Sequence, residues 1–206
     1  MKVSLTDAGK RFNRDWIFRH LTCSFETGTS YAIIGPNGSG KSTLLQVLSG
    51  SMQLSEGKGQ WTLGKGQLPN EEVYRHVSIC APYLEVVEEM NLHEFLKFHH
   101  HFKPFISSLT IDSIISIMGL HEATHKQIRY YSSGMKQRVK LAQAFFSDTA
   151  LLLLDEPCTN LDAPGIELYN RLIESFCTNR LVIVSSNDKT EYSFCREKIN
   201  IADFKN

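Results

Sequence analysis

Short apolar runs recur along the chain, separated by polar turns or by longer segments. They cover residues 31–34, 77–81, 150–154 and 181–185. Their length and continuous hydrophobicity are typical of strands buried on both faces, as in a parallel sheet. Helices are predicted at residues 41–49, closed by Gly50, and at residues 166–176. Strands that alternate with helices predict an α/β fold in which helices cover both faces of a largely parallel sheet.

Shorter apolar patterns at the two ends of the chain add less regular elements. Strands are predicted at residues 3–6 and 21–26, on either side of a polar segment with aromatic residues at 10–18. A further short strand is predicted at 60–63, among glycine-rich turns. The last residues, 198–204, predict only a short tail.

Between residues 91 and 130 the pattern changes to that of amphipathic helices. Apolar or aromatic positions repeat at intervals of three and four residues in two groups. These are Leu92, Phe95, Leu96 and His99, and then Ile111, Ile114, Ile115 and Met118. Thr110 is a suitable N-cap and Gly119 a suitable stop for the second group. With a third helix that begins near Gly134, they predict a helical lobe inserted into the α/β core.

Three consecutive histidines, residues 99–101, raise the question of a metal site. Successive residues on a helix point about 100° apart, so three in a row cannot face one ion. We expect a partly exposed helix end instead.

Composition limits the kind of partner and the compartment. The 206 residues include 22 Lys or Arg and 22 Asp or Glu, so no net charge attracts nucleic acid or acidic lipid. We therefore expect no direct binding to nucleic acid. No apolar run reaches 18 residues and the N-terminus lacks the apolar core of a signal peptide, which favours the cytosol. The five scattered cysteines fit reduced thiols.

The first candidate site is the loop between the strand at 31–34 and the helix at 41–49. It fits the pattern of Gly, four residues, then Gly-Lys-Ser/Thr. Such a loop folds its backbone N–H groups around phosphates, and the helix N-terminus adds partial positive charge. Lys41 is placed to reach the β- and γ-phosphates, and the Ser42 hydroxyl to bind Mg²⁺. The predicted ligands are Gly35, Pro36, Asn37, Gly38, Ser39, Gly40, Lys41, Ser42 and Thr43.

A second candidate site follows the apolar run at 150–154. Asp155 and Glu156 come directly after that strand, where ligands bind in parallel sheets. Asp155 suits the Mg²⁺ shell, directly or through water. Glu156 suits the role of polarising the water that attacks the γ-phosphate.

A Ser-Ser-Gly segment at 132–134 opens the third predicted helix, and alone it is only an N-cap. Its place in the chain changes its meaning: it follows the phosphate loop and the helical lobe and precedes the Asp-Glu pair and Asn160-Leu161-Asp162. In this order of motifs the chain resembles the ATP-binding cassette (ABC) ATPases. Residues 131–135 take the place of that family's Leu-Ser-Gly-Gly-Gln signature.

The resemblance implies a P-loop NTPase core, an N-terminal antiparallel β-subdomain and an inserted α-helical subdomain. Residues 1–206 would be one ATP-binding domain, with the lobe at about 91–147. Two cassettes of this family sandwich ATP and Mg²⁺ between them. By similarity Ser132 and Gly134 would contact the γ-phosphate of the partner's ATP, and Asp162 would reach across the dimer. Phe12 lies where an aromatic ring stacks on adenine, with Trp16 as a nearby rival.

The chain departs from the family pattern at two positions. Pro82 falls where the family usually has a glutamine that touches Mg²⁺, so Tyr83, Glu85 or water would have to serve. Asn187 replaces the histidine that contacts the γ-phosphate. An asparagine amide can donate a hydrogen bond to phosphate but does not titrate. We expect slow hydrolysis, by an active ATPase, without a histidine-dependent pH profile.

Two functions compete on this basis. The first is the ATPase subunit of an ABC transporter, peripheral on the cytosolic face of the inner membrane, with a second cassette and a separate transmembrane permease as partners. The alternative is a soluble ABC switch that acts on ribosomes or DNA. Such switches usually carry two cassettes or a long coiled coil, and the chain shows neither a second phosphate loop nor sustained heptads.

Overall fold

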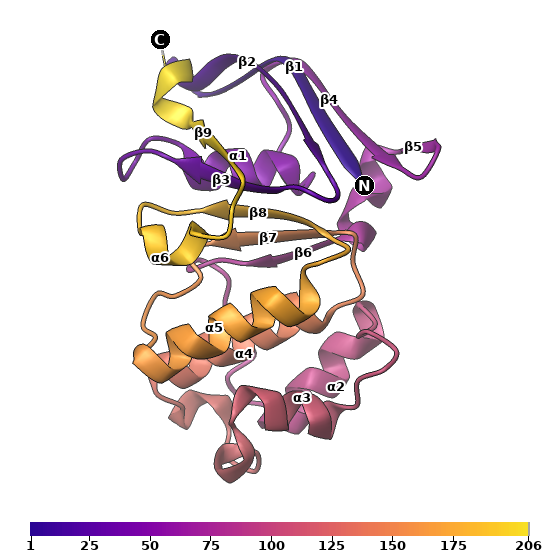
Figure 1. Cartoon of the computed structure of the whole chain (residues 1–206), viewed down its shortest axis with the longest axis vertical. Helices are drawn as coiled ribbons and strands as arrows, with labels where there is room; N and C mark the ends of the chain where they lie inside the picture. The colour runs from indigo at the N-terminus through magenta and orange to yellow at the C-terminus, as the bar shows by residue number, and fades with distance from the viewer. Residues whose placement is uncertain (206) are drawn as a thin grey trace. The chain divides into compact units, whose positions relative to one another are not determined.

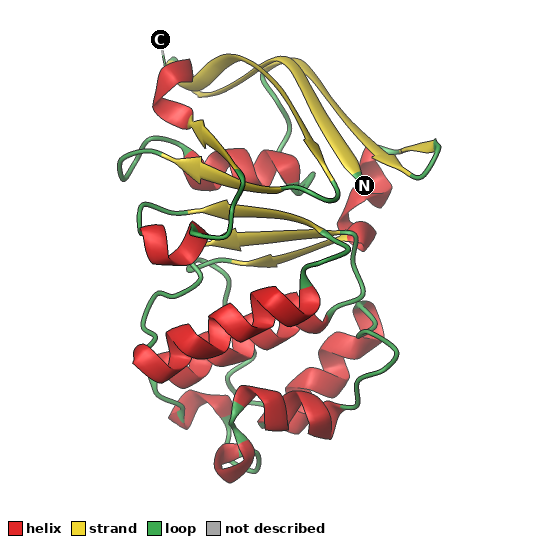
Figure 2. Cartoon of the chain, in the orientation of Figure 1, coloured by secondary structure: helices red, strands yellow, loops and turns green. Residues whose placement is uncertain are grey.

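The computed structural model describes residues 1–205, which form two sheets and a group of helices (Figures 1 and 2). The antiparallel sheet has the order β2-β1-β4-β5. Its strands are β1 (Lys2–Phe12), β2 (Asp15–Glu26), β4 (Glu56–Leu63) and β5 (Gly66–Leu68). The second sheet has the order β6-β7-β8-β3-β9. Its strands are β3 (Ser30–Ile34), β6 (Val77–Cys80), β7 (Leu151–Asp155), β8 (Leu181–Ser185) and β9 (Glu197–Asn200).

Helices connect these strands. They are α1 (Lys41–Leu48), α2 (Leu92–Phe102), α3 (Ile111–Met118), α4 (Ser133–Phe146), α5 (Ala163–Phe176) and α6 (Lys189–Tyr192). Short 3₁₀ turns lie at Asn70–His76, His121–Ala123, Ile128–Tyr130 and Ile201–Phe204. None of the helices in residues 1–205 is long and apolar enough to cross a membrane.

Contacts between residues divide the chain into two compact units. The first comprises Met1–Ile79, Ala150–Glu156 and Asn179–Asn206, and holds both sheets except Cys80 at the end of β6, together with α1 and α6. The second, the helical unit, comprises Cys80–Thr149 and Pro157–Thr178 and holds α2 to α5. The chain passes from the first unit to the helical unit at Cys80 and again at Pro157.

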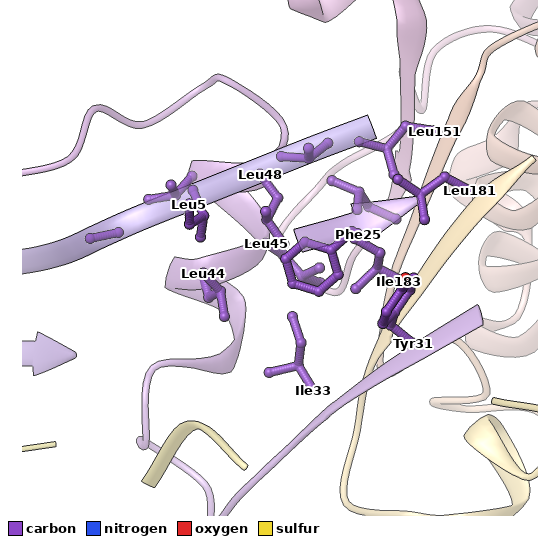
Figure 3. Close-up of a cluster of buried hydrophobic side chains, with 14 of the residues drawn as sticks. Leu5, Phe25, Tyr31, Ile33, Leu44, Leu45, Leu48, Leu151, Leu181 and Ile183 are labelled. Atoms are coloured by element: carbon purple, nitrogen blue, oxygen red, sulfur yellow. The ribbon is translucent and has the colours of Figure 1, made fainter. Parts of the chain in front are cut away.

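The core of the first unit explains why its sheets form. Apolar side chains from β1, β2, β3, β7, β8 and α1 meet in one cluster (Figure 3). Its members include Leu5, Phe25, Tyr31, Ile33, Leu44, Leu45, Leu48, Leu151, Leu181 and Ile183, each less than 5% exposed. Burial of side chains of this size contributes about 1.5–3 kcal/mol each, which holds the sheet under the phosphate loop in place.

Capping residues set the ends of the helices in the helical unit, and the sequence predicted two of them, Thr110 and Gly119. Asn91 and Glu94 form a capping box at the start of α2, and Thr110 and Ser113 form one at α3. Gly119 ends α3 in the left-handed conformation, with a φ of 66°. Ser132 caps α4 by accepting a hydrogen bond from the Met135 N–H.

The predicted α/β class, with an antiparallel sheet, a mostly parallel sheet and inserted helices, is confirmed. Two details of the prediction were wrong. Residues 10–18 lie mainly in strands of the β1–β2 hairpin, because bulges along β1 break the alternation that would have revealed it. The expected tail includes β9, which pairs in parallel with β3 from Tyr31↔Glu197 to Ile34↔Asn200.

The histidine run lies at a partly exposed end of α2, as expected, and its three rings have different surroundings. His99 is only partly exposed, its ring stacks on Phe105 at 5.5 Å between ring centroids, and its Nε2 lies 2.9 Å from Ser147 Oγ. Burial lowers the pKa of His99 to about 4, with smaller effects from Lys103 and His100. His100 and His101 are exposed, so the three rings do not share a site.

This burial predicts a loss of stability in acid. Unfolded His99 takes up a proton near its ordinary pKa of about 6.5, whereas folded His99 resists protonation until about pH 4. The stability that the protein owes to neutral, buried His99 is therefore fully present above about pH 6.5 and is lost as the pH falls toward 4. In His99→Gln, the unfolding temperature should fall less between pH 7.5 and pH 5 than in the wild type. His93→Gln, at an exposed position of the same helix, should behave like the wild type.

Candidate functional site

The loop between β3 and α1 has the backbone of a phosphate cradle. Gly35, Gly38 and Gly40 have φ angles of 148°, 75° and 105°, a region that residues with a Cβ rarely adopt. A Cβ at Gly40 would also collide with the side chain of Ile17. Only glycine allows this course, which turns the loop directly into the N-terminus of α1.

Lys41, the first residue of α1, is folded back over this loop. Its side chain is 5% exposed, and its Nζ donates hydrogen bonds to the carbonyl oxygens of Gly35 at 2.9 Å and Pro36 at 3.3 Å. Ser39 Oγ is buried without a hydrogen-bond partner. A buried ammonium and an unpaired hydroxyl beside a helix N-terminus are groups that suit an anion.

Strand register places the acidic pair at the same edge of the sheet as the loop. Ile33 in β3 pairs with Ser185 in β8, and Ser185 pairs with Asp155 in β7. The three residues form one row, and the phosphate loop begins two residues after Ile33. The structure therefore brings together two motifs that lie more than a hundred positions apart in the sequence.

Asp155 has the chemistry of a metal ligand. It is 2% exposed, and its Oδ1 has no hydrogen-bond partner. A buried carboxylate oxygen left unpaired is costly unless a cation or a water meets it. Within residues 1–205, no group of three or more His, Cys, Asp or Glu side chains could hold a metal ion. The donor set instead suits Mg²⁺, which keeps several waters and takes one or two protein ligands plus phosphate oxygens.

Glu156 has an unusual backbone. Its φ of 44° lies in the left-handed region, and its N–H donates a 2.9 Å hydrogen bond to the Ser185 carbonyl oxygen. A non-glycine residue in this conformation costs of order 1 kcal/mol or more and persists only where its surroundings enforce it. This conformation turns the chain directly after β7, at the same end of the strand as Asp155.

Asn187, the residue expected to contact the γ-phosphate, is hydrogen-bonded to the phosphate loop. Its Nδ2 donates a 2.9 Å hydrogen bond to Asn37 Oδ1 within the loop. Both side chains are exposed, so the amide can turn toward a ligand.

This contact sharpens the expectation for Asn187. Asn187→Ala should slow ATP hydrolysis about 10-fold or more, because a hydrogen bond to a charged group contributes about 1.5–3 kcal/mol. The rate at saturating ATP, measured from pH 6 to 8.5, should show no histidine-like inflection in the wild type. An unchanged rate in the variant would exclude Asn187 from the chemistry.

The Ser-Ser-Gly segment and Asp162 lie together in the helical unit. They line a cavity of about 660 Å³, to which Ser132, Gly134, Arg138, Asn160 and Asp162 all contribute. Asp162 caps α5 by accepting from the Gly165 N–H, and it also pairs with Arg138 at 3.4 Å. The cavity thus joins the N-terminus of α4 to polar side chains around it.

Comparison with known proteins identifies the family of this chain. A family model described as ABC transporter matches residues 18–159, more than half of the chain. The chain belongs to the ABC transporter family. It is therefore an ABC ATPase domain, with the nucleotide binding and ATPase activity that define such domains.

Individual relatives agree with this assignment. The chain is 29% identical over 207 residues to the uncharacterized ABC transporter ATP-binding protein YhcH of Bacillus subtilis, covering 97% of this chain and 66% of that protein. It is 25% identical over 205 residues to the cytochrome c biogenesis ATP-binding export protein CcmA of Haemophilus influenzae, covering 99% and 97%. In fold it resembles the solved structure of an ATP-binding subunit of an ABC transporter, with a TM-score of 0.84, 21% identity and coverage of 98% and 87%.

The aromatic residues of the β1–β2 hairpin differ in their availability. Phe12 is 46% exposed, with Lys10 Nζ 5.2 Å from its ring centroid. Trp16 lies under two guanidinium groups, with Arg19 at 4.5 Å and Arg11 at 5.5 Å from its ring. Phe12 therefore offers the freer stacking surface of the two in this ABC domain.

The position of the family's glutamine is a turn. Pro82 is exposed there, the Leu84 N–H donates to the Ala81 carbonyl, and Lys140 Nζ donates to the Pro82 carbonyl at 3.1 Å. Tyr83 and Glu85, the suggested substitutes, are also exposed.

One side chain that the sequence analysis missed connects several of these segments. Gln137 of α4 is 4% exposed and is hydrogen-bonded to Pro157 and Cys80. A polar residue four positions before the buried Leu141, on an apolar helix face, was the signal that could have revealed it.

Proposed function

We propose that this chain is the ATP-hydrolysing subunit of an ABC transporter. One observation carries the proposal: Asp155 pairs in a single row with Ser185 and Ile33, and Glu156 and the phosphate loop follow the strands of that row. The unpaired Asp155 Oδ1 and Ser39 Oγ at the ends of those strands are polar groups that a nucleotide with its metal would satisfy.

ATP would be held by the loop from Gly35 to Thr43. The backbone N–H groups of the loop and the N-terminus of α1 would surround the phosphates. Lys41 would exchange its bonds to the loop carbonyls for bonds to the β- and γ-phosphates. Phe12 would stack on the adenine ring.

Ser42 and Asp155 would hold Mg²⁺. When bound, this ion would neutralise part of the charge on the β- and γ-phosphate oxygens. The residues present fit that task, since a hydroxyl and one carboxylate leave the remaining positions to phosphate and water.

Glu156 would accept the proton of the attacking water, and Asn187 would donate a hydrogen bond to the γ-phosphate. The hydrogen bond from the Glu156 N–H to the Ser185 carbonyl oxygen holds the backbone from which the Glu156 carboxylate extends. Asn187 begins from its bond to Asn37, next to the place where the γ-phosphate would lie.

A second cassette would complete each site. Ser132 and Gly134 offer a hydroxyl and free N–H groups at the start of α4, and Asp162 lines the same cavity. These groups would face the γ-phosphate of ATP bound to the partner cassette. Hydrolysis removes the phosphate that joins the two cassettes, so the pair would open and release its grip.

The partner that uses this motion would be a separate transmembrane permease, with the cassette at the cytosolic face of the inner membrane. CcmA is named as an export protein and YhcH as part of an ABC transporter. The cargo of the present chain stays open. A soluble switch acting on ribosomes or DNA is the alternative, and the balance of 22 basic and 22 acidic residues gives it no support.

A purification with ATP present tests this proposal. Glu156→Gln should bind ATP without hydrolysing it and so hold its partners longest. Mild-detergent affinity purification should then recover a stoichiometric integral membrane protein. The double variant Lys41→Ala/Glu156→Gln, whose ATP binding should be strongly weakened, is the matched control. Recovery of ribosomes, DNA or only soluble proteins would replace the transporter with the switch.

A further inference from the structure

The chain enters the helical unit from the first unit twice, and Gln137 is hydrogen-bonded at both of these points. Gln137 Nε2 donates a 2.7 Å hydrogen bond to the carbonyl oxygen of Pro157 and lies 3.6 Å from Cys80 Sγ. Cys80 and Pro157 are the first residues of the helical unit after the two crossings. Because a carbonyl oxygen only accepts, its contact fixes the orientation of the Gln137 amide, and both N–H groups of that amide are used.

The Pro157 carbonyl belongs to the residue after Glu156. Glu156 has a φ of 44°, and its own N–H is tied to the Ser185 carbonyl. A strained residue keeps its conformation only if the chain is held on both sides of it. Ser185 supplies the bond before Glu156, and Gln137 supplies the bond after it.

We infer that Gln137 is a positioning residue for ATP hydrolysis, which fixes the Glu156–Pro157 peptide and with it the direction of the Glu156 carboxylate. The inference rests on the proposed role of Glu156 as the base. Gln137 would act through the Pro157 carbonyl, to which it is hydrogen-bonded.

The surroundings make this bond strong. Gln137 is 4% exposed, and its neighbours on α4, Val139 and Leu141, are fully buried. A hydrogen bond shielded from water is stronger, and losing its donor leaves a buried carbonyl unsatisfied. Two lysines near Gln137 on α4 are engaged elsewhere, Lys136 with Glu88 and Lys140 with the Pro82 carbonyl, so neither takes its place.

Gln137 also contacts the residue that precedes the segment around Pro82, where the chain departs from the family pattern. Cys80 ends β6, two residues before Pro82, which cannot offer a side-chain ligand. Two hydrogen bonds of the Gln137 amide, one to Cys80 at the end of β6 and one to Pro157, connect these two residues. A displacement of the residues around Pro82 by a bound partner would therefore reach the Glu156–Pro157 peptide through this amide.

The first test replaces Gln137 by leucine, which keeps the approximate volume and removes both donors. We expect kcat per ATP-binding site to fall about 10- to 100-fold, because a small misplacement of a catalytic group costs up to that factor. KM for ATP should stay within about 2-fold, because the phosphate loop is untouched. Gln143→Leu, the same change at a half-buried position of α4, should hydrolyse ATP like the wild type.

The second test separates positioning from packing. In Gln137→Glu a buried carboxylate cannot donate to Pro157, whereas its protonated form can. Burial raises the pKa of such a carboxyl group. The rate per ATP-binding site relative to wild type should therefore rise as the pH falls from 8 to 6. In Gln137→Leu the same ratio should not change with pH.

Rates are counted per ATP-binding site, so a loss of folded protein does not imitate the effect. A Gln137→Leu rate equal to wild type would overturn the inference, as would a Gln137→Glu ratio that is independent of pH. Parallel measurement of Glu156→Gln distinguishes the two levels of argument. If that variant is inactive while Gln137→Leu is normal, only the positioning role fails. If it hydrolyses ATP normally, the proposed role of Glu156 fails first.

Discussion

Lys41→Ala should strongly weaken ATP binding and, with it, slow ATP hydrolysis. The ammonium is almost completely buried and already bonded to two loop carbonyls, so its charge is held at the place where the phosphates would lie. Hydrogen bonds from a charged donor contribute about 1.5–3 kcal/mol, so affinity should fall roughly 10- to 150-fold from one such bond alone. Titration with a fluorescent ATP analogue measures the change directly.

The matched control for this substitution is Lys65→Ala. Lys65 is exposed in the turn between β4 and β5, and its removal changes the net charge by the same amount. Its affinity for ATP should equal that of the wild type. A Lys41→Ala protein that binds ATP as tightly as Lys65→Ala would show that the loop does not hold the phosphates.

Glu156→Gln should lower kcat by about 10²–10⁴, the range that a positioned general base contributes. ATP binding should persist, because the glutamine keeps the size of the side chain and the backbone bond to Ser185 is unaffected. Single-turnover hydrolysis and equilibrium binding, measured on the same preparation, separate the two effects.

Glu174→Gln provides the corresponding control. It makes the same chemical change at an exposed position of α5 and should hydrolyse ATP at the wild-type rate. Size-exclusion chromatography adds a second readout, since ATP should drive Glu156→Gln into a dimer of cassettes. Wild-type turnover by Glu156→Gln would assign the base to another residue.

Much of the fold was predictable because its signals are local. The apolar run at 181–185 coincides with β8, and Thr110 and Gly119 bound α3 as expected. Continuous apolar runs can only be buried strands when turns flank them closely. The phosphate loop was predictable for a related reason, since glycines and a lysine at fixed spacing have few other uses.

The misses have a different physical origin. β9 has two charged residues in four and forms because β3 offers it a free edge, a long-range contact that no local pattern contains. Gln137 was missed because its partners lie 20 and 57 positions away.

The candidate site shows the same division. The phosphate loop and the Asp-Glu pair could be picked out from the sequence as candidates. Their arrangement along one row through Ser185 depends on strand register, which the sequence does not reveal. The strain at Glu156 and the choice between Phe12 and Trp16 depend on contacts that only the folded chain displays.

The stacking of Trp16 has a practical consequence for spectroscopy. The chain has two tryptophans. Trp61 is buried and donates its indole N–H to the Leu48 carbonyl, whereas Trp16 sits beside two guanidinium groups and next to Ile17, which packs against Gly40 of the phosphate loop. Indole emission responds to nearby charge, so the emission of Trp16, one residue before a contact of the phosphate loop, is expected to change when ATP binds. In a Trp61→Phe background, ATP binding can be followed by that emission, with no dye attached.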